Sequence, residues 1–316
     1  RTRRWLHRSV AGCACAILVT GCGTSAHRPA TPTGAPDSSA ANSPDAAPPT
    51  GPVASGAAIA DPGAFASNLS FTDISSQVNQ ALAGVTTRKL SFGRAVMKVP
   101  LDWANPTNGK TVSITVLRVR SASEQDRLGS LVINPGGPGG SGTEAALDLA
   151  VSELPQAILD RFDIVGFDPR GIGLSDPLNC IPAKEKDAQL NMPPDPVSDA
   201  DWAAMVAEDT KMADECYSIY GSDLTFYSTT ETVRDMEALR SKLGDPKLTY
   251  LGYSYGTLLG AEYASAYPDK VRALVLDGAV DPTISTVDQD QTQAAGFQLA
   301  FSHYAADCTK SGKCAL

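Results

Sequence analysis

The chain has 316 residues, enough for one large domain or two smaller ones, and 42% of them are hydrophobic, which can supply a sizeable core. Its formal net charge is -9, and its Lys and Arg residues cluster only within the first eight positions. Since phosphate binding needs a basic face, this charge pattern argues against a nucleic-acid partner.

An export signal is predicted at the N-terminus. Several arginines among the first eight residues precede an apolar run at residues 10–19, which is too short to span a bilayer. Residues 19–22, Val-Thr-Gly-Cys, resemble a bacterial lipobox, in which the cysteine, here Cys22, is lipidated. The alternative is a plain secretory signal with an incidental cysteine. We expect a lipoprotein signal peptide over residues 1–22 and an exported protein, extracellular or held at the cell membrane only through a lipid anchor at Cys22.

The next segment, residues 23–62, is predicted to be a disordered tether. It is rich in Pro, Ala, Ser, Thr and Gly and contains almost no large apolar residue. Such a segment cannot bury enough surface to offset its chain entropy. A lipid-anchored surface protein needs this kind of tether between its anchor and its folded domain.

The cysteine count agrees with export. Of the seven cysteines, two leave with the signal peptide and Cys22 is the lipidation candidate, so that four remain in the folded part. These four are Cys180, Cys216, Cys308 and Cys314. An even number in an exported chain suggests two disulfides, and among three connectivities the spacing favours Cys180–Cys216 and Cys308–Cys314. A metal site is the weaker alternative, since no His accompanies the cysteines and neither pair has Cys-x-x-Cys spacing. We expect neither a metal nor a cofactor.

The folded core is expected to start at residue 63, with helical periodicity from about Phe71. Residues 95–100 and 111–119 then alternate between two faces, which is typical of strands. The sequence Asn-Pro-Thr-Asn-Gly between them has turn chemistry. The pattern predicts an antiparallel hairpin at a sheet edge.

A glycine-rich loop follows the next predicted strand. Residues 129–134 are a short continuous apolar run, as expected for a strand buried on both faces. Residues 135–142 read Pro-Gly-Gly-Pro-Gly-Gly-Ser-Gly. A phosphate-binding loop is the alternative, but no Lys-Ser/Thr pair follows. The position after the third strand favours an oxyanion-hole loop.

Residues 161–175 form the next predicted strand and its exit loop, which contains Asp168 and Arg170. Both could be catalytic, but a charged pair in a glycine-rich loop beside an active site more often braces that loop. The chain then becomes polar and helical, and residues 228–240 predict a capped amphipathic helix with apolar residues at 233, 236 and 239.

A nucleophile elbow is predicted around Ser254. The β-prone residues 248–253 run into Gly-Tyr-Ser-Tyr-Gly at 252–256, and helix-forming residues follow at once. A bare Gly-x-Ser-x-Gly occurs by chance in many proteins, but a strand before it and a helix after it are the context that the elbow requires. The glycines leave room for a serine in a strained turn, and the helix N-terminus favours a developing negative charge.

Another buried strand is predicted at residues 271–277, ending at Asp277. Strands that alternate with helices in this order predict a mostly parallel sheet with functional loops at the C-terminal strand ends. Ser254, the loop at 136–142 and Asp277 all lie at such ends, so they can share one crevice.

Four motifs in this order carry a family resemblance: residues 134–142, 168–175, 252–256 and 276–282. Together they resemble the secreted tripeptidyl-aminopeptidase-like α/β-hydrolases of actinobacteria and, more distantly, the proline iminopeptidases. The resemblance covers roughly residues 65–316.

The resemblance implies an α/β-hydrolase fold, a mostly parallel sheet with flanking helices. Its core would span residues 63–285, and residues 286–316 would begin a helical cap, with the last strands missing. It also implies a serine exopeptidase that releases short peptides from free N-termini. Ser254 would be the nucleophile, and the backbone N–H groups of Gly137 and Tyr255 would form the oxyanion hole.

The catalytic base is where the sequence departs from this pattern. Triad order in the fold is Ser, then Asp or Glu, then His, and the only histidine after Ser254 is His303, in the expected cap. We expect His303 to be a packed residue of the cap. Asp277 could be the acid, but two alternatives have at least equal weight: Asp281 as the acid, or a buried loop-bracing role for Asp277. The family's acid and histidine would follow Leu316.

We therefore expect the chain to be truncated at its C-terminal end. We expect the same of its N-terminal end, because the sequence begins with Arg rather than Met. Loss of the base costs on the order of a million-fold in turnover, so the 316 residues alone are expected to be inactive. Two functions compete with the peptidase: a lipase or esterase on the same fold, and a non-catalytic surface lipoprotein that binds peptide or cell-wall material.

Overall fold

The computed structural model describes residues 61–123, 125–191 and 196–311. The predicted signal peptide, the lipidation candidate Cys22 and the tether up to residue 60 lie outside the described residues, as does Cys314. The accounts below concern the described part of the chain.

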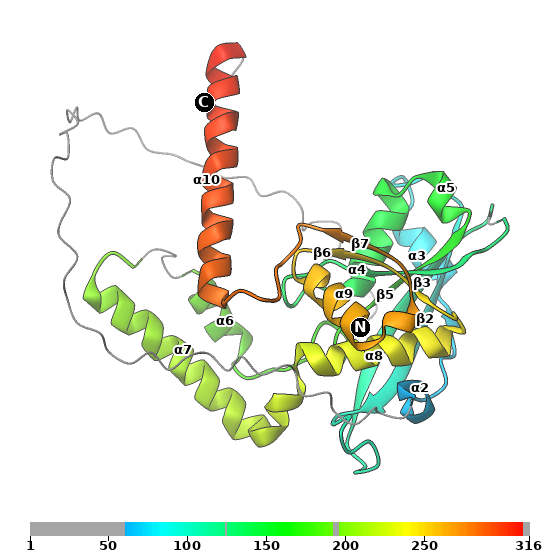
Figure 1. Cartoon of the computed structure of the whole chain (residues 1–316), viewed down its shortest axis with the longest axis horizontal. Helices are drawn as coiled ribbons and strands as arrows, with labels where there is room; N and C mark the ends of the chain where they lie inside the picture. The colour runs from blue at the N-terminus through cyan, green and yellow to red at the C-terminus, as the bar shows by residue number, and fades with distance from the viewer. Residues whose placement is uncertain (1–60, 124, 192–195, 312–316) are drawn as a thin grey trace. The chain divides into compact units, whose positions relative to one another are not determined.

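A seven-stranded sheet organises this part, in the order β1-β2-β3-β5-β4-β6-β7 (Figure 1). The strands are β1 (Thr72–Asp73), β2 (Leu90–Pro100), β3 (Thr111–Ser121), β4 (Gly129–Asn134), β5 (Phe162–Phe167), β6 (Leu248–Tyr253) and β7 (Val271–Asp277). Strands β5, β4, β6 and β7 pair in parallel, whereas β1, β2, β3 and β5 pair antiparallel. The α/β class is confirmed, with a mixed sheet whose parallel half carries the predicted site.

The predicted hairpin is formed by β2 and β3, which pair from Pro100 opposite Thr111 onward. Its position at the sheet edge was predicted wrongly, because the short strand β1 pairs with the outer side of β2. The helix expected from about Phe71 begins at Ser75, and a short helix already spans Pro62–Phe65. The ring of Phe71 lies 3.9 Å from the guanidinium carbon of Arg118 on β3, which is consistent with this segment being extended along the sheet.

The helices of the described residues are α2 (Pro62–Phe65), α3 (Ser75–Ala81), α4 (Gly142–Asp148), α5 (Gln156–Leu159), α6 (Ala183–Leu190), α7 (Asp199–Tyr220), α8 (Thr229–Leu243), α9 (Tyr255–Ala266) and α10 (Thr286–Ser311). A π-helical turn, Leu149–Glu153, extends α4, and 3-10 turns lie at Gly221–Phe226 and Pro268–Lys270. None of these helices is both long enough and apolar enough to cross a membrane. Helix α10 contains no buried residue.

Helices cover both faces of the sheet. Side chains of α3, α4 and α5 share a core with one face, which includes Leu251 of β6. The neighbouring Tyr250 points to the opposite face, where its ring lies beside Gly260 of α9. Helix α8 packs against α9 on that side (Figure 1). All six residues of β4 are buried because this central strand is covered from both sides, as its apolar run predicts.

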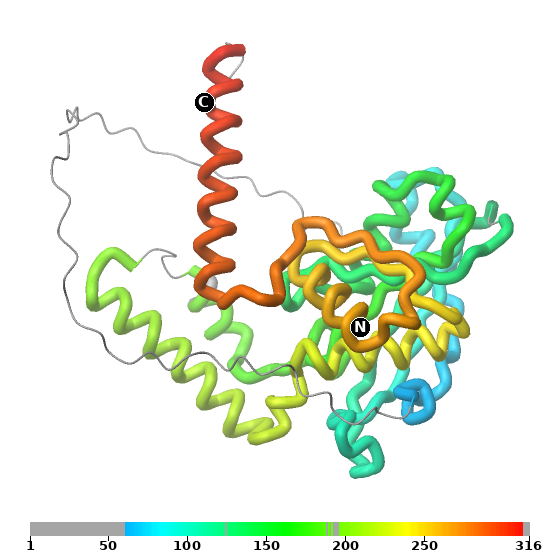
Figure 2. The backbone as a smooth tube through the Cα atoms, viewed as in Figure 1, coloured from blue at the N-terminus to red at the C-terminus, as the bar shows by residue number. Residues whose placement is uncertain are grey.

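The parallel strands end at the same edge of the sheet (Figure 2). The loop at 135–141 leaves β4 there, the loop at 168–175 leaves β5, and Ser254 follows β6. Helix α8 starts close by: its N-cap is Ser228, and Thr229 Oγ1 lies 2.9 Å from the hydroxyl of Tyr255. The fold therefore gathers segments that are far apart in the sequence around Ser254.

Candidate active site

Ser254 lies in the sharp turn between β6 and α9, as the motif predicts. Its φ of 51° and ψ of -123° are strained for a residue with a side chain, at a typical cost of about 1–3 kcal/mol. A methyl group at Gly252 would lie 2.5 Å from the carbonyl oxygen of Gly256, and one at Gly256 would lie 2.7 Å from the carbonyl oxygen of Asn134. Both motif glycines are therefore required by close backbone contacts.

The serine side chain is exposed, and its backbone is held on both sides. Its amide donates to the carbonyl oxygen of Asp277 at 2.9 Å, and its carbonyl oxygen accepts from the amide of Thr257 at 2.8 Å. Ser254 is the N-cap residue of α9, yet its hydroxyl makes no capping hydrogen bond. The geometry thus fixes the backbone of the residue without engaging its hydroxyl in the cap.

The glycine-rich loop packs directly against this turn through Gly136. A methyl group there would lie 3.0 Å from the amide nitrogen of Tyr255 and 3.1 Å from Cβ of Ser254, and would overlap the carbonyl oxygen of Tyr253. The φ of Gly136 is also positive, at 87°. The loop and the amide of Tyr255 therefore come together, as an oxyanion hole requires.

Gly137, the other predicted oxyanion donor, is the next residue of this loop and is exposed. Its φ is 110°, and a methyl group on it would lie 2.8 Å from the amide nitrogen of Gly139. The loop therefore turns back on itself at Gly137, while Gly136 makes the contact with the elbow. The role of Gly137 as a donor stays a prediction.

Asn134 is a site residue that the sequence reasoning missed. Its side chain is buried, and its Oδ1 accepts from the amide of Gly136 at 2.9 Å. Its backbone and side-chain oxygens also lie against Gly256, so that Asn134 contacts both the glycine-rich loop and the elbow. An asparagine at the end of a buried strand, just before Pro-Gly-Gly, was the available signal.

Asp168 has a bracing role, as the sequence favoured, and it holds the glycine-rich loop at 135–142 as well as its own loop at 168–175. It is fully buried, and its Oδ1 accepts from Ser141 Oγ at 2.7 Å and from both the amide and the hydroxyl of Thr143 at 3.0 Å. Its Oδ2 accepts from the amide of Leu174 at 2.9 Å. The carboxylate therefore ties the start of α4 to the exit loop of β5, which confirms a structural role.

Arg170 is buried and braces its own loop, residues 168–175. Its guanidinium donates to both carboxylate oxygens of Asp235 on α8, at 2.8 and 2.7 Å, and to the carbonyl oxygens of Leu101 and Phe226. Burial opposes the charge of Arg170, but Asp235 and then Glu231 raise its pKa. The indole of Trp103 donates to the same Asp235 at 2.9 Å. No sequence pattern pointed to this partner, which lies 65 residues from Arg170.

The candidate acids lie on the strand after the elbow. Asp277 ends β7 with an exposed side chain, opposite Tyr253 in the β6–β7 register. The pKa of Tyr253 is raised, mainly by burial and further by the carboxylates of Glu153 and Asp277. The carboxylate of Asp281 accepts from the amide and hydroxyl of Thr283, which lower its pKa.

His303, the only histidine among the described residues, lies on α10 and is exposed rather than packed. The sequence predicted packing because Phe301 and Tyr304 flank it. Both of these rings are exposed as well, at 60% and 56%. The aromatic pattern was therefore misread as a buried face.

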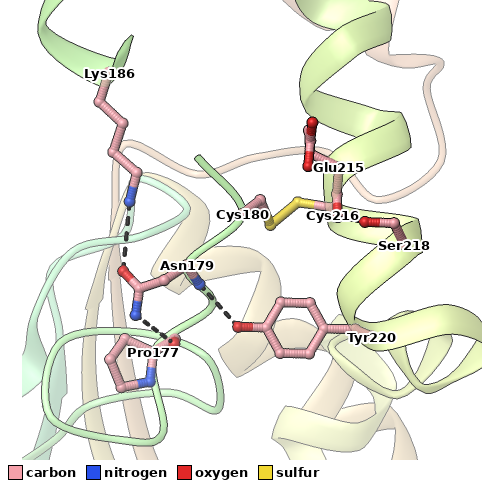
Figure 3. The surroundings of a disulfide bond; sticks show 8 residues. All are labelled: Pro177, Asn179, Cys180, Lys186, Glu215, Cys216, Ser218 and Tyr220. Carbon is pink, nitrogen blue, oxygen red and sulfur yellow. Dashed lines mark hydrogen bonds between the residues drawn. A yellow bond between two sulfur atoms is a disulfide. The ribbon is translucent and has the colours of Figure 1, made fainter. Parts of the chain in front are cut away.

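The disulfide Cys180–Cys216 is present, as predicted, with the two Cα atoms 4.6 Å apart (Figure 3). It joins the segment after the 168–175 loop to the last turn of α7. Beside it, the amide of Asn179 donates to the hydroxyl of Tyr220 at 2.9 Å. The predicted Cys308–Cys314 pair reaches beyond the described residues.

No group of three or more His, Cys, Asp or Glu side chains within the described ranges is arranged to hold a metal ion. The chemistry that this arrangement can support is that of a serine hydroxyl beside backbone N–H groups. Nucleophilic attack on a carbonyl carbon fits such a set of groups.

The chain is similar in sequence to several known hydrolases. The serine protease Hip1 of Mycobacterium tuberculosis is 42% identical over 222 residues, which are 70% of this chain and 42% of Hip1. The tripeptidyl aminopeptidase of Streptomyces coelicolor is 40% identical over 187 residues, 58% of this chain and 34% of that protein. Carboxylesterase B of Mycobacterium tuberculosis is 36% identical over 227 residues, 70% of this chain and 42% of that protein.

The chain spans less than half the length of these relatives. A family model described as alpha/beta hydrolase fold matches residues 129–316, from β4 through the elbow and beyond. This match includes Ser254, the glycine-rich loop and the loop after β5. Since it covers more than half of the chain, the protein belongs to the alpha/beta hydrolase fold family.

Proposed function

We propose that this protein is an exported serine hydrolase, an aminopeptidase that releases short peptides from free N-termini through an acyl-enzyme on Ser254. The observation that carries the proposal is the contact of Gly136 with the Ser254 turn, which brings the amide of Tyr255 to the glycine-rich loop. The similarity to a serine protease and a tripeptidyl aminopeptidase supports a peptide substrate.

In the proposed reaction, the Ser254 hydroxyl attacks the scissile carbonyl carbon and passes its proton to a histidine base. The amides of Gly137 and Tyr255 donate hydrogen bonds to the oxyanion of the tetrahedral intermediate, whose charge the N-terminus of α9 also favours. The amine leaves with the proton from the base, and water then hydrolyses the acyl-enzyme. We assign the base to a histidine other than His303, and the acid to Asp277, to Asp281 or to a residue outside those described.

The test compares the complete protein, produced from its full reading frame, with its Ser254→Ala variant. We expect a fluorophosphonate to label the wild type on Ser254, and tripeptide release from an unblocked peptide to fall by about 10⁶-fold in the variant. An N-acetylated copy of the peptide is the matched control and should be a poor substrate. Equal labelling of both proteins would contradict the proposal.

The base has its own test. The 316 residues produced alone should hydrolyse peptides about a million-fold more slowly than the complete protein, because we propose that the base lies outside them. Equal rates would show that the base lies within these residues, and His303→Ala would then identify it.

An esterase is the second candidate, because carboxylesterase B has 36% identity to this chain. The acyl-enzyme chemistry is the same for both substrates, so the elbow alone does not separate them. The ratio of kcat/KM for an unblocked tripeptide amide to that for a short acyl ester decides between the two. We expect the peptide to be preferred.

A further inference from the structure

The turn that carries Ser254 is fastened by a hydroxyl that the catalytic motif does not include. Thr257 lies in the first turn of α9 and is almost fully buried, at 1% exposure. Its Oγ1 donates to the carbonyl oxygen of Ser254 at 2.6 Å, alongside the 2.8 Å hydrogen bond from the Thr257 amide. In an ordinary helix start, the N-cap side chain accepts from a backbone amide of the first turn. Here a side chain of the first turn donates to the N-cap backbone instead.

The same hydroxyl also holds the loop that follows β7. The amide of Val280 donates to Thr257 Oγ1 at 2.8 Å, so that this oxygen acts as donor and acceptor at once. A second link joins the loop to the turn, because the Ser254 amide donates to the Asp277 carbonyl oxygen at 2.9 Å. Gly278, between these two links, has a φ of 68°. The loop 277–280 is therefore attached to both backbone groups of Ser254.

We propose that Thr257 is a positioning residue of the hydrolase, and that its hydroxyl couples the strained conformation of Ser254 to the loop 277–280. This inference rests on the proposed function. Ser254 keeps its strained backbone only if its surroundings hold it there, and Thr257 supplies a contact on its carbonyl side. A small displacement of a nucleophile from its attack geometry can lower the rate by about 100-fold.

The hydroxyl can be removed without a change of shape. Thr257→Val keeps the branched side chain and loses both the donor and the acceptor, whereas Thr257→Ser loses only a methyl group and keeps both. In the complete protein, we expect Thr257→Val to lower kcat and the rate of fluorophosphonate labelling by about 10–100-fold, with KM changed by less than about threefold. Thr257→Ser should stay within about threefold of the wild type in all three quantities.

The thermal midpoint of each variant is measured in parallel, and rates are compared well below the lowest midpoint. If Thr257→Val does not fold, Thr257→Ala replaces it, because alanine removes the hydroxyl without adding an apolar group beside the Val280 amide. Labelling of the folded variant at the wild-type rate would overturn the positioning role, as would an equal loss in Thr257→Ser. A wild type that neither reacts with the fluorophosphonate nor hydrolyses peptide or ester would overturn the proposed function, and this inference with it.

Discussion

The carboxylate of Asp168 accepts a 2.7 Å hydrogen bond from the hydroxyl of Ser141, which lies 27 residues earlier in the chain. Ser141 is the N-cap of α4 and lies at the end of the glycine-rich loop. One buried carboxylate on the loop after β5 thus holds the far end of the loop that contacts Ser254. Asp168 needs no contact with a substrate to matter for the site.

Asp168→Asn should therefore impair both folding and activity. The amide keeps the size of the side chain but turns an NH₂ group toward a buried donor, which costs about 1–3 kcal/mol for each hydrogen bond lost. We expect the free energy of unfolding in urea to fall by about 2–4 kcal/mol. Asp223→Asn, at an exposed ion pair with Lys110, is the control and should change it by less than about 1 kcal/mol. Equal values for both variants would contradict a bracing role.

Substitutions at two glycines of the glycine-rich loop distinguish the effect of backbone strain from the effect of contact with the elbow. Gly136 and Gly139 both have positive φ, of 87° and 106°, but a methyl group at Gly139 meets nothing within 4 Å. Gly136→Ala should lower kcat/KM by 100-fold or more, because the added carbon displaces the loop from Ser254 and Tyr255. Gly139→Ala should lose about 1–2 kcal/mol of stability and keep its activity within about tenfold. Similar kcat/KM values for the two variants would show that the contact of Gly136 with the elbow does not contribute to activity.

The buried carboxylate of Asp163 predicts an acid-sensitive contribution to stability. Burial opposes its ionisation, but hydrogen bonds and charges from Arg120 and Arg127 hold its pKa below the ordinary value. A group with a lowered folded-state pKa stabilises the fold above its unfolded pKa of about 4, and this stabilisation disappears as the pH falls through the folded value.

Asp163→Asn should therefore lower the free energy of unfolding by about 1.5–3 kcal/mol at pH 7. The gap between variant and wild type should close as the pH is lowered below about 4. Chemical unfolding between pH 2.5 and 7 measures it, with Asp209→Asn on exposed α7 as the control. A gap that stays constant over this range would refute the pKa argument.

The Cys180–Cys216 disulfide closes a loop with a sequence separation of 36 residues around α6 and α7. No residue of α7 is buried, so this link is a main restraint on the helix. Replacing both cysteines by serine should remove about 3–4 kcal/mol of stabilisation and expose residues 176–220 to proteases. Limited proteolysis followed by mass spectrometry locates the cuts, and reduction of the wild type should reproduce them. Resistance in both cases would show that packing, not the disulfide, holds α7.

The sequence alone determined the local elements of the site, because these depend on short spacings. Gly-Tyr-Ser-Tyr-Gly between a β-prone run and helix-forming residues predicts the turn at Ser254, since only glycine fits the crowded positions beside it. The continuous apolar run at 129–134 predicts a strand buried on both faces. The Cys180–Cys216 pair was predicted from the even number of cysteines in the folded part and from the spacing of these two along the chain.

Only the tertiary structure decided which distant groups meet. The run of glycines does not predict which of them contacts the elbow. Gly136 does so, rather than Gly137, because of the register in which β4 and β6 pair. The same holds for Asp235 beside Arg170 and for Val280 beside Thr257. Such contacts depend on the order of the strands in the sheet and on the helices packed against it. A hydrophobic pattern indicates which face of a segment is buried, but not which residues lie opposite that face.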